Sequence, residues 1–278
     1  MTLSNIYYAI AIHWSSDLLP QIPISVGSYQ LTFRTIDTDG TTPIIVHDPA
    51  VTNPIRFDMH VGFPTTPRIQ FTMPVVFADF ANAPHVMPVR PRSYFATLPI
   101  TDGFMITPDY FLPVPRNFNK KIFCAPGSSF VSALAHIEAG WELESNTADR
   151  IRIDSASSDI VLGNSKQMLF DIFLVLEELG YTYLHDRNTG TSIIRECDIS
   201  ILNEILPAIK FTVTTISGDY TEIIFEPREY MRYGNDGYCH LGLAFSDNSQ
   251  TRIGSAMFRK YAVSFSNRNK SISFCLGK

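Results

Sequence analysis

Twelve of the 18 prolines in this 278-residue chain lie between residues 49 and 118. Proline cannot donate a backbone hydrogen bond to a β-ladder, so strands in this segment should be short, at sheet edges or broken by loops. The chain also contains 20 phenylalanines and 12 tyrosines, and this aromatic richness favours strands over a helical bundle. The sequence therefore predicts a mostly β protein with many short strands and irregular connections.

The composition argues against two classes of partner. The 22 basic residues are scattered and the net charge is −5, so the chain lacks the positive field that drives nucleic-acid binding. Its longest apolar runs, such as residues 6–12, are far shorter than the roughly 20 residues that span a bilayer. We interpret residues 6–12 as a first strand, because no basic segment precedes them. We expect no nucleic-acid binding and no membrane insertion, and we expect any targeting segment to have been removed from this sequence.

Apolar patterning and turn residues divide the chain. The strand candidates in the first part are 22–26, 29–36, 43–46, 68–77 and 94–106, with Asp37 to Gly40 as a turn signal before Pro43. Residues 117–127 carry two lysines and a Pro-Gly pair, which is typical of a surface crossing. We therefore expect an N-terminal β lobe over residues 1–118 and a C-terminal lobe over 119–278.

One helix is predicted over residues 165–179. Its apolar residues recur at helical spacing, Asn164 or Ser165 can cap its start, and Gly180 can end it. Residues 128–140 are interpreted as a short helix or a loop with strand character. Hairpins are expected for 181–184 with 192–195, 210–216 with 221–225, and 261–265 with 271–274.

The segment Arg152 to Ser158 stands out before this helix. Asp154 follows an apolar strand and is flanked by small hydroxyl residues, which can hold an exposed carboxylate by hydrogen bonds. Further motifs follow in a fixed order: Ile153-Asp-Ser-Ala-Ser157, the helix, Leu206-Pro-Ala-Ile-Lys-Phe211, Phe225-Glu-Pro-Arg-Glu-Tyr230, Ile253-Gly-Ser-Ala-Met-Phe-Arg-Lys-Tyr-Ala-Val-Ser-Phe265, Asn269 and Ile272-Ser-Phe274. Over about residues 150–275 this order resembles the C-terminal lobe of the pepsin-like aspartic proteases.

The resemblance implies a pepsin-like bilobal fold with an abbreviated or diverged N-terminal lobe. It implies that Asp154 is the counterpart of a catalytic aspartate, with Ser155 cross-linking two active-site loops and Ser157 bonding the aspartate. Ala156 stands where the family has glycine, and Ser255 where it has aspartate.

Catalysis in that family needs a second carboxylate, because two like charges sharing a proton supply both a base and an acid. The N-terminal candidate is Asp48, which follows the strand 43–46. Pro49 and Ala50 replace the threonine and glycine expected after it.

The four cysteines contain no C-x-x-C pair, so they permit two disulfides in three connectivities or four free thiols. The resemblance implies a Cys197–Cys239 disulfide, with Cys124 and Cys275 as the remaining pair. Disulfides would place the protein in a secreted or secretory-pathway compartment.

Three functions remain open from the sequence. We favour a diverged, non-catalytic aspartic-protease-like protein that binds a peptide or protein, or that serves as a subunit of an oligomer or complex. The second is an active aspartic endopeptidase that pairs Asp154 with Asp48 or with an aspartate of another chain. The third is an unrelated all-β structural or interaction protein. No Gly-x-Ser-x-Gly motif and no helical histidine pair occurs, so we expect no serine hydrolase site, no metal and no cofactor.

Overall fold

The computed structural model describes residues 9–29, 31–38, 43–64, 69–81, 85–89, 101–115, 131–134, 141–145, 150–163, 166–186, 190–234, 236–246, 250–266 and 271–276. Within these residues the protein is mostly β, with four helices of which only one is long. The predicted fold class is therefore confirmed at the level of a mostly β protein.

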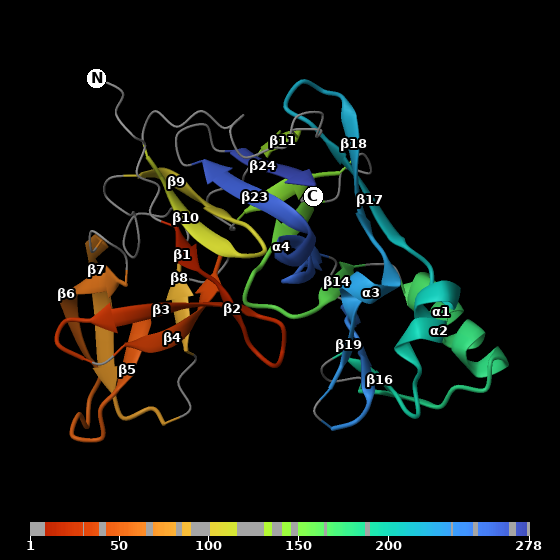
Figure 1. Cartoon of the computed structure of the whole chain (residues 1–278), viewed down its shortest axis with the longest axis horizontal. Coiled ribbons are helices and arrows are strands. Elements are labelled where there is room, and N and C mark those ends of the chain that lie inside the picture. The colour runs from red at the N-terminus through yellow and green to blue at the C-terminus, as the bar shows by residue number, and fades with distance from the viewer. Residues whose placement is uncertain are drawn as a thin grey trace.

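Most strands of the first part of the chain belong to one seven-stranded sheet, at the left of Figure 1. Its order is β5-β7-β6-β3-β4-β8, with β2 paired to β3. The strands are β2 (His13–Trp14), β3 (Pro20–Val26), β4 (Thr32–Asp37), β5 (Ile44–His47), β6 (Ile55–Phe63), β7 (Ile69–Ala78) and β8 (Val86–Pro88).

The second part of the chain forms three smaller sheets. One has the order β12-β13-β22-β14-β21, one β15-β16-β20-β19, and β17 pairs with β18 in a projecting hairpin (Figure 1). Their strands are β12 (Glu142–Glu144), β13 (Arg150–Ile153), β14 (Ile160–Gly163), β15 (Tyr183–His185), β16 (Ser192–Ile194), β17 (Ile209–Thr214), β18 (Tyr220–Phe225), β19 (Met231–Tyr233), β20 (Cys239–Leu241), β21 (Leu243–Ser246) and β22 (Thr251–Ile253). The helices are α1 (Lys166–Glu178), α2 (Ile199–Ile205), α3 (Pro227–Tyr230) and α4 (Ala256–Lys260).

A six-stranded sheet joins the two parts, with the order β1-β10-β9-β23-β24-β11. Its strands are β1 (Ile10–Ala11), β9 (Thr101–Ile106), β10 (Tyr110–Pro115), β11 (Val131–Leu134), β23 (Tyr261–Ser266) and β24 (Ser271–Leu276). The central pairing is antiparallel and sets Phe104 opposite Phe265. Their rings stack with centroids 4.6 Å apart, and one hydrophobic core runs from the first part of the chain to the second.

The two parts repeat one arrangement of four strands. In the first part, β4 leads through a turn to β5, and these strands pair in parallel with β8 and β7 respectively. In the second part, β13 leads through a turn to β14, and these pair in parallel with β22 and β21. The strands occur in the same order along the chain in both cases. This repetition gives the turn after β4 and the turn after β13 equivalent places in the fold.

The predicted helix is confirmed as α1, and Gly180 ends it with a φ of +79°. Tyr181 donates to the carbonyl of Leu176, which closes the last turn. The three predicted hairpins form as β15–β16, β17–β18 and β23–β24. Asn164 and Ser165, the expected caps of the helix, lie outside the described residues.

The proline-rich segment departs from the sequence prediction. β7 has ten residues, contains Pro74 and lies between β5 and β6, so it is neither short nor an edge strand. The ladder with β5 begins only at Val75, opposite Ile44, so Pro74 stands just outside it. The described residues of 128–140 form the strand β11 rather than a helix.

Candidate active site

The equivalent turns after β4 and β13 are cross-linked by four hydrogen bonds. The Thr38 hydroxyl donates to the Ile153 carbonyl at 2.9 Å and accepts from the Ser155 amide at 3.0 Å. The Ser155 hydroxyl donates to the Ile36 carbonyl at 2.5 Å and accepts from the Thr38 amide at 3.1 Å. Both side chains are fully buried, so the bonds are shielded from water and hold the two turns together.

This cross-link places Asp37 beside Asp154. Each aspartate immediately precedes one of the two cross-linking residues, at the end of an equivalent strand. Both are buried, with 8% and 7% of their surface exposed. The backbone of each is tied to the strand beside it, because the Asp37 carbonyl accepts from the Val89 amide and the Asp154 amide donates to the Ile253 carbonyl. The fold therefore places two buried aspartates, each one residue before a member of the cross-link, where the two parts of the chain meet.

Both carboxylate oxygens of Asp154 have donors. Oδ1 accepts from the Ala156 amide at 3.0 Å, and Oδ2 accepts from Nη1 of Arg252 at 3.1 Å. Arg252 lies on β22, one residue before Ile253, whose carbonyl accepts from the Asp154 amide. Its side chain is 40% exposed, whereas that of Asp154 is 11% exposed. Arg252 is therefore the more exposed partner of this ion pair.

Ala156 fits in place of the family's glycine without strain. Among the residues that the structure describes, only Leu18 and Glu196 combine a side chain with a positive φ, so the turn at Ala156 does not need glycine. Gly254 is different, since a Cβ there would lie 2.4 Å from the Ser157 carbonyl oxygen. This glycine lets β22 approach the Asp154 turn.

The structure places the other predicted site residues differently. Ser155 forms the expected cross-link, but the Ser157 hydroxyl donates to the Asp159 carbonyl at 3.4 Å, so the expected bond to Asp154 is replaced by that of Arg252. Asp48 lies at the end of β5 distant from the turn, about 13 Å along the strand from Ile44. Its Oδ1 accepts from the Ala50 amide in a local turn. The aspartate next to the Thr38–Ser155 cross-link is therefore Asp37 and not Asp48.

Asp37 lies in a run that also has the composition of a turn, and from the sequence it is assigned only to that turn. Ile36-Asp37-Thr38-Asp39-Gly40 has the apolar residue, aspartate and threonine that Ile153-Asp154-Ser155 also shows. Asp39 separates the threonine from the glycine, so the run resembles an ordinary Asp-Gly turn. A comparison with the second turn, residue by residue, could have identified it.

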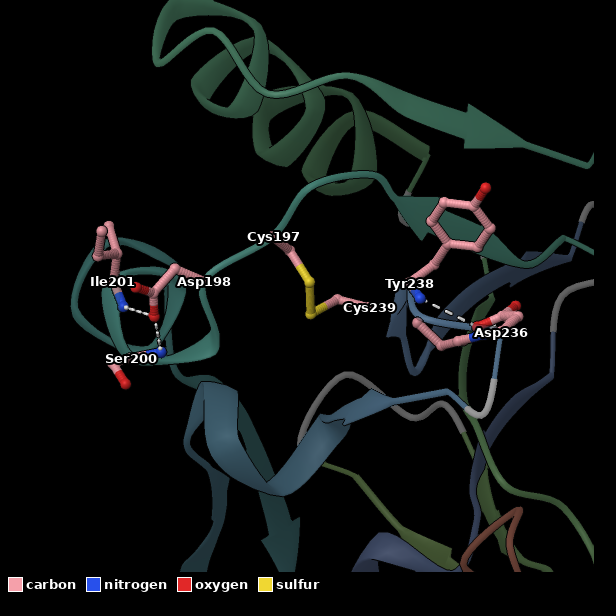
Figure 2. The surroundings of a disulfide bond; sticks show 8 residues. Cys197, Asp198, Ser200, Ile201, Asp236, Tyr238 and Cys239 are labelled. Atoms are coloured by element: carbon pink, nitrogen blue, oxygen red, sulfur yellow. Dashed lines mark hydrogen bonds and ion pairs between the residues drawn. A yellow bond between two sulfur atoms is a disulfide. The ribbon is translucent and has the colours of Figure 1, made fainter.

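The Cys197–Cys239 disulfide is present, with the Cα atoms 6.0 Å apart (Figure 2). It ties the start of α2 to β20, beside the Asp198 side chain that caps α2 by accepting from the Ser200 and Ile201 amides. This prediction is confirmed, and a disulfide is consistent with an oxidising compartment. Cys124, the expected partner of Cys275, lies outside the described residues.

The described part of the chain contains no cluster of three or more histidine, cysteine, aspartate or glutamate side chains that could hold a metal ion. None of its helices has the length and apolar character needed to cross a membrane.

No protein-family model matches the sequence, and no curated protein matches it significantly. The geometry of the two turns is therefore the feature from which a function can be inferred.

Proposed function

We propose that the protein is a diverged pepsin-like aspartic endopeptidase whose catalytic pair is Asp37 and Asp154. The observation that carries the proposal is the reciprocal cross-link between Thr38 and Ser155, which holds the two aspartates at equivalent positions. The repeated four-strand arrangement and the shared six-stranded sheet support the bilobal part of the proposal.

Two carboxyl groups that share a site can hydrolyse a peptide bond without a metal. Repulsion between their charges favours a state with one proton between them, so one group is a base and the other an acid. The carboxylate removes a proton from a water molecule as its oxygen attacks the peptide carbonyl carbon. The carboxylic acid donates its proton to the carbonyl oxygen, which gives a tetrahedral intermediate. The first aspartate then passes the proton it took from water to the amide nitrogen, the C–N bond breaks to release the amine, and a hydroxyl of the intermediate returns its proton to the second aspartate.

The buried position of the pair suits this chemistry. The backbones of Asp37 and Asp154 are each hydrogen-bonded to the chain beside them, so the two turns need little backbone reorganisation when a substrate binds. The substrates we propose are extended peptides, which can lie across the two turns and pair with strand edges by backbone hydrogen bonds.

The test is cleavage of an unfolded protein mixture between about pH 3 and pH 7, a range that covers the titration of carboxyl pairs. We expect Asp37→Asn and Asp154→Asn each to reduce the rate by about a thousandfold or more, because each removes one partner of the acid–base pair. A statine-type peptide should inhibit the wild-type protein. Asp48→Asn is the matched control and should retain wild-type activity.

The proposal fails if the folded wild-type protein cleaves nothing in this range, or if Asp37→Asn cleaves as fast as wild type. Circular dichroism and thermal unfolding of each variant show whether a lost activity reflects lost folding.

A non-catalytic peptide-binding protein is the second candidate. The observation that favours it is the Arg252–Asp154 ion pair, which occupies an oxygen that catalysis would use. This second function predicts that the protein binds the statine-type peptide and, although folded, cleaves no substrate.

A further inference from the structure

Arg252 differs from the residue at the equivalent ladder position of the first part. In the parallel ladder of β13 with β22, Arg252 stands opposite Arg152. In the equivalent ladder of β4 with β8, the corresponding pair is Thr35 and Val86. Directly opposed residues of a parallel pair face the same side of the sheet, so two arginines share one face of the strands that lead to Asp154, where the strands at Asp37 carry a threonine and a valine.

The environment of Arg252 leaves its guanidinium able to bind another partner. The side chain is 40% exposed, and its described ion pair is the single contact to Asp154 Oδ2 at 3.1 Å. An arginine can bind a carboxylate through two parallel N–H donors, and such paired bonds are stronger than a single one. A carboxylate on a peptide lying over the turns would therefore compete with Asp154 for Arg252.

We propose that Arg252 recognises an acidic side chain of the substrate next to the scissile bond. This inference rests on the proposed peptidase function and names its substrate class: peptides with aspartate or glutamate beside the bond that is cleaved. In the free protein Arg252 pairs with Asp154. When an acidic substrate binds, the guanidinium turns to the substrate carboxylate and leaves Asp154 Oδ2 for the attacking water. A neutral substrate leaves the ion pair in place and is cleaved slowly.

The test uses blocked peptides that differ only in glutamate or glutamine beside the scissile bond, which mass spectrometry first locates in the cleaved protein mixture. The wild-type protein should favour the glutamate peptide in kcat/KM by about tenfold or more, as expected for a charge-assisted bond. Arg252→Met should cleave the glutamate peptide more slowly and the glutamine peptide faster. Arg252→Lys should keep part of the preference, because it keeps the charge without the paired donors.

Arg150→Met is the matched control. Arg150 lies on the same sheet and pairs with Glu142 rather than with Asp154. Its loss should therefore leave the ratio of kcat/KM for the glutamate peptide to kcat/KM for the glutamine peptide unchanged. A damaged fold would slow both peptides together, whereas the proposed role moves them in opposite directions.

A binding measurement separates this inference from the proposed function. Two statine-type peptides, one with glutamate and one with glutamine next to the statine, are titrated into wild-type protein and Arg252→Met. Tighter binding of the glutamate peptide by wild type, lost in the variant, supports the role of Arg252 even if no peptide is cleaved. Equal binding of the two peptides by wild type, or cleavage without a glutamate preference, overturns it while leaving the proposed peptidase intact.

Discussion

The side chains of Thr38 and Ser155 both stabilise the protein and position the two aspartates that precede them. Each hydroxyl both donates to and accepts from the opposite turn, so each side chain satisfies one carbonyl and one amide that have no water available. Buried polar groups without partners are costly, so the cross-link stabilises the protein as well as locating the aspartates.

Replacing Ser155 with alanine should lower the free energy of unfolding by about 2 kcal/mol or more, because the Ile36 carbonyl and the Thr38 amide both lose a buried partner. Chemical denaturation measures the change. The double variant Thr38→Val/Ser155→Ala should lose less than the sum of the single variants, since the two residues share the same network. Ser158→Ala, which removes only a partly buried bond to Asp159, is the control. A loss no larger than that of the control would contradict the structural role.

At the residue scale the sequence predicted one half of the candidate site. Asp154 and Ser155 were identifiable because the motifs after them keep their order along the chain. Asp37 was not, because its partnership with Asp154 depends on residues more than a hundred positions apart. Arg252 was not predicted either, since its place is set by the register of β22 against β13.

Among the elements, β4 makes a titratable contact with the residue just before β8. Nη1 of Arg34 lies 2.9 Å from Nδ1 of His85, and the Thr35 amide donates to the His85 carbonyl. Desolvation and then the Arg34 charge lower the pKa of His85 below its ordinary value. His85 therefore accepts from Arg34 only while the imidazole is neutral.

The pKa of His85 is lower in the folded protein than in the unfolded chain, so the unfolded chain takes up the proton more readily. The contribution of His85 to stability is therefore present above about pH 6.5 and is lost as the pH falls through the folded value. His85→Gln keeps an acceptor for Arg34 and does not titrate. The melting temperature of this variant should fall less than that of wild type between about pH 7 and pH 5.

His60→Gln is the control for this measurement, because His60 is exposed on β6 and the side-chain contact described for its ring is with the Thr72 hydroxyl. Parallel pH dependence in wild type and His85→Gln would show that the Arg34–His85 contact does not titrate with folding.

The elements that the sequence predicted are those with a strong local pattern. α1 and the three hairpins of the second part have clear periodicity and turn residues. The short helices α2 and α4 have only seven and five residues, too few for a periodic signal, and they form where a cap or the packing of a strand end allows them. The place of β7 between two strands is likewise set by long-range pairing.

For the molecule as a whole, the pairing of β9 with β23 in the six-stranded sheet holds the first part of the chain against the second. Gly103 on β9 is packed so closely that a Cβ would lie 1.7 Å from the Phe265 carbonyl oxygen of β23, and its φ is +153°. No side chain fits there without a shift of one backbone against the other.

Gly103→Ala should therefore destabilise the protein by about 3 kcal/mol or more, through overpacking added to backbone strain. Gly218→Ala is the matched control, because Gly218 also has a positive φ but nothing lies within 4 Å of its added Cβ. It should cost about 1 to 2 kcal/mol, from backbone strain alone. Equal losses in thermal unfolding would show that β9 and β23 can separate without penalty.

The six-stranded sheet also has a consequence for the time at which the candidate site forms during synthesis. β9, at residues 101–106, can pair only after β23, at residues 261–266, has been synthesised. The Asp154 amide likewise has its hydrogen-bond acceptor only once Ile253 is present. Such distant pairings form slowly, because a long loop must close before any contact is gained. While a ribosome is still adding residues before 253, Asp37 and Asp154 can both be present without the neighbours that hold them. The candidate site therefore cannot be completed during synthesis until nearly all of these strands have been made.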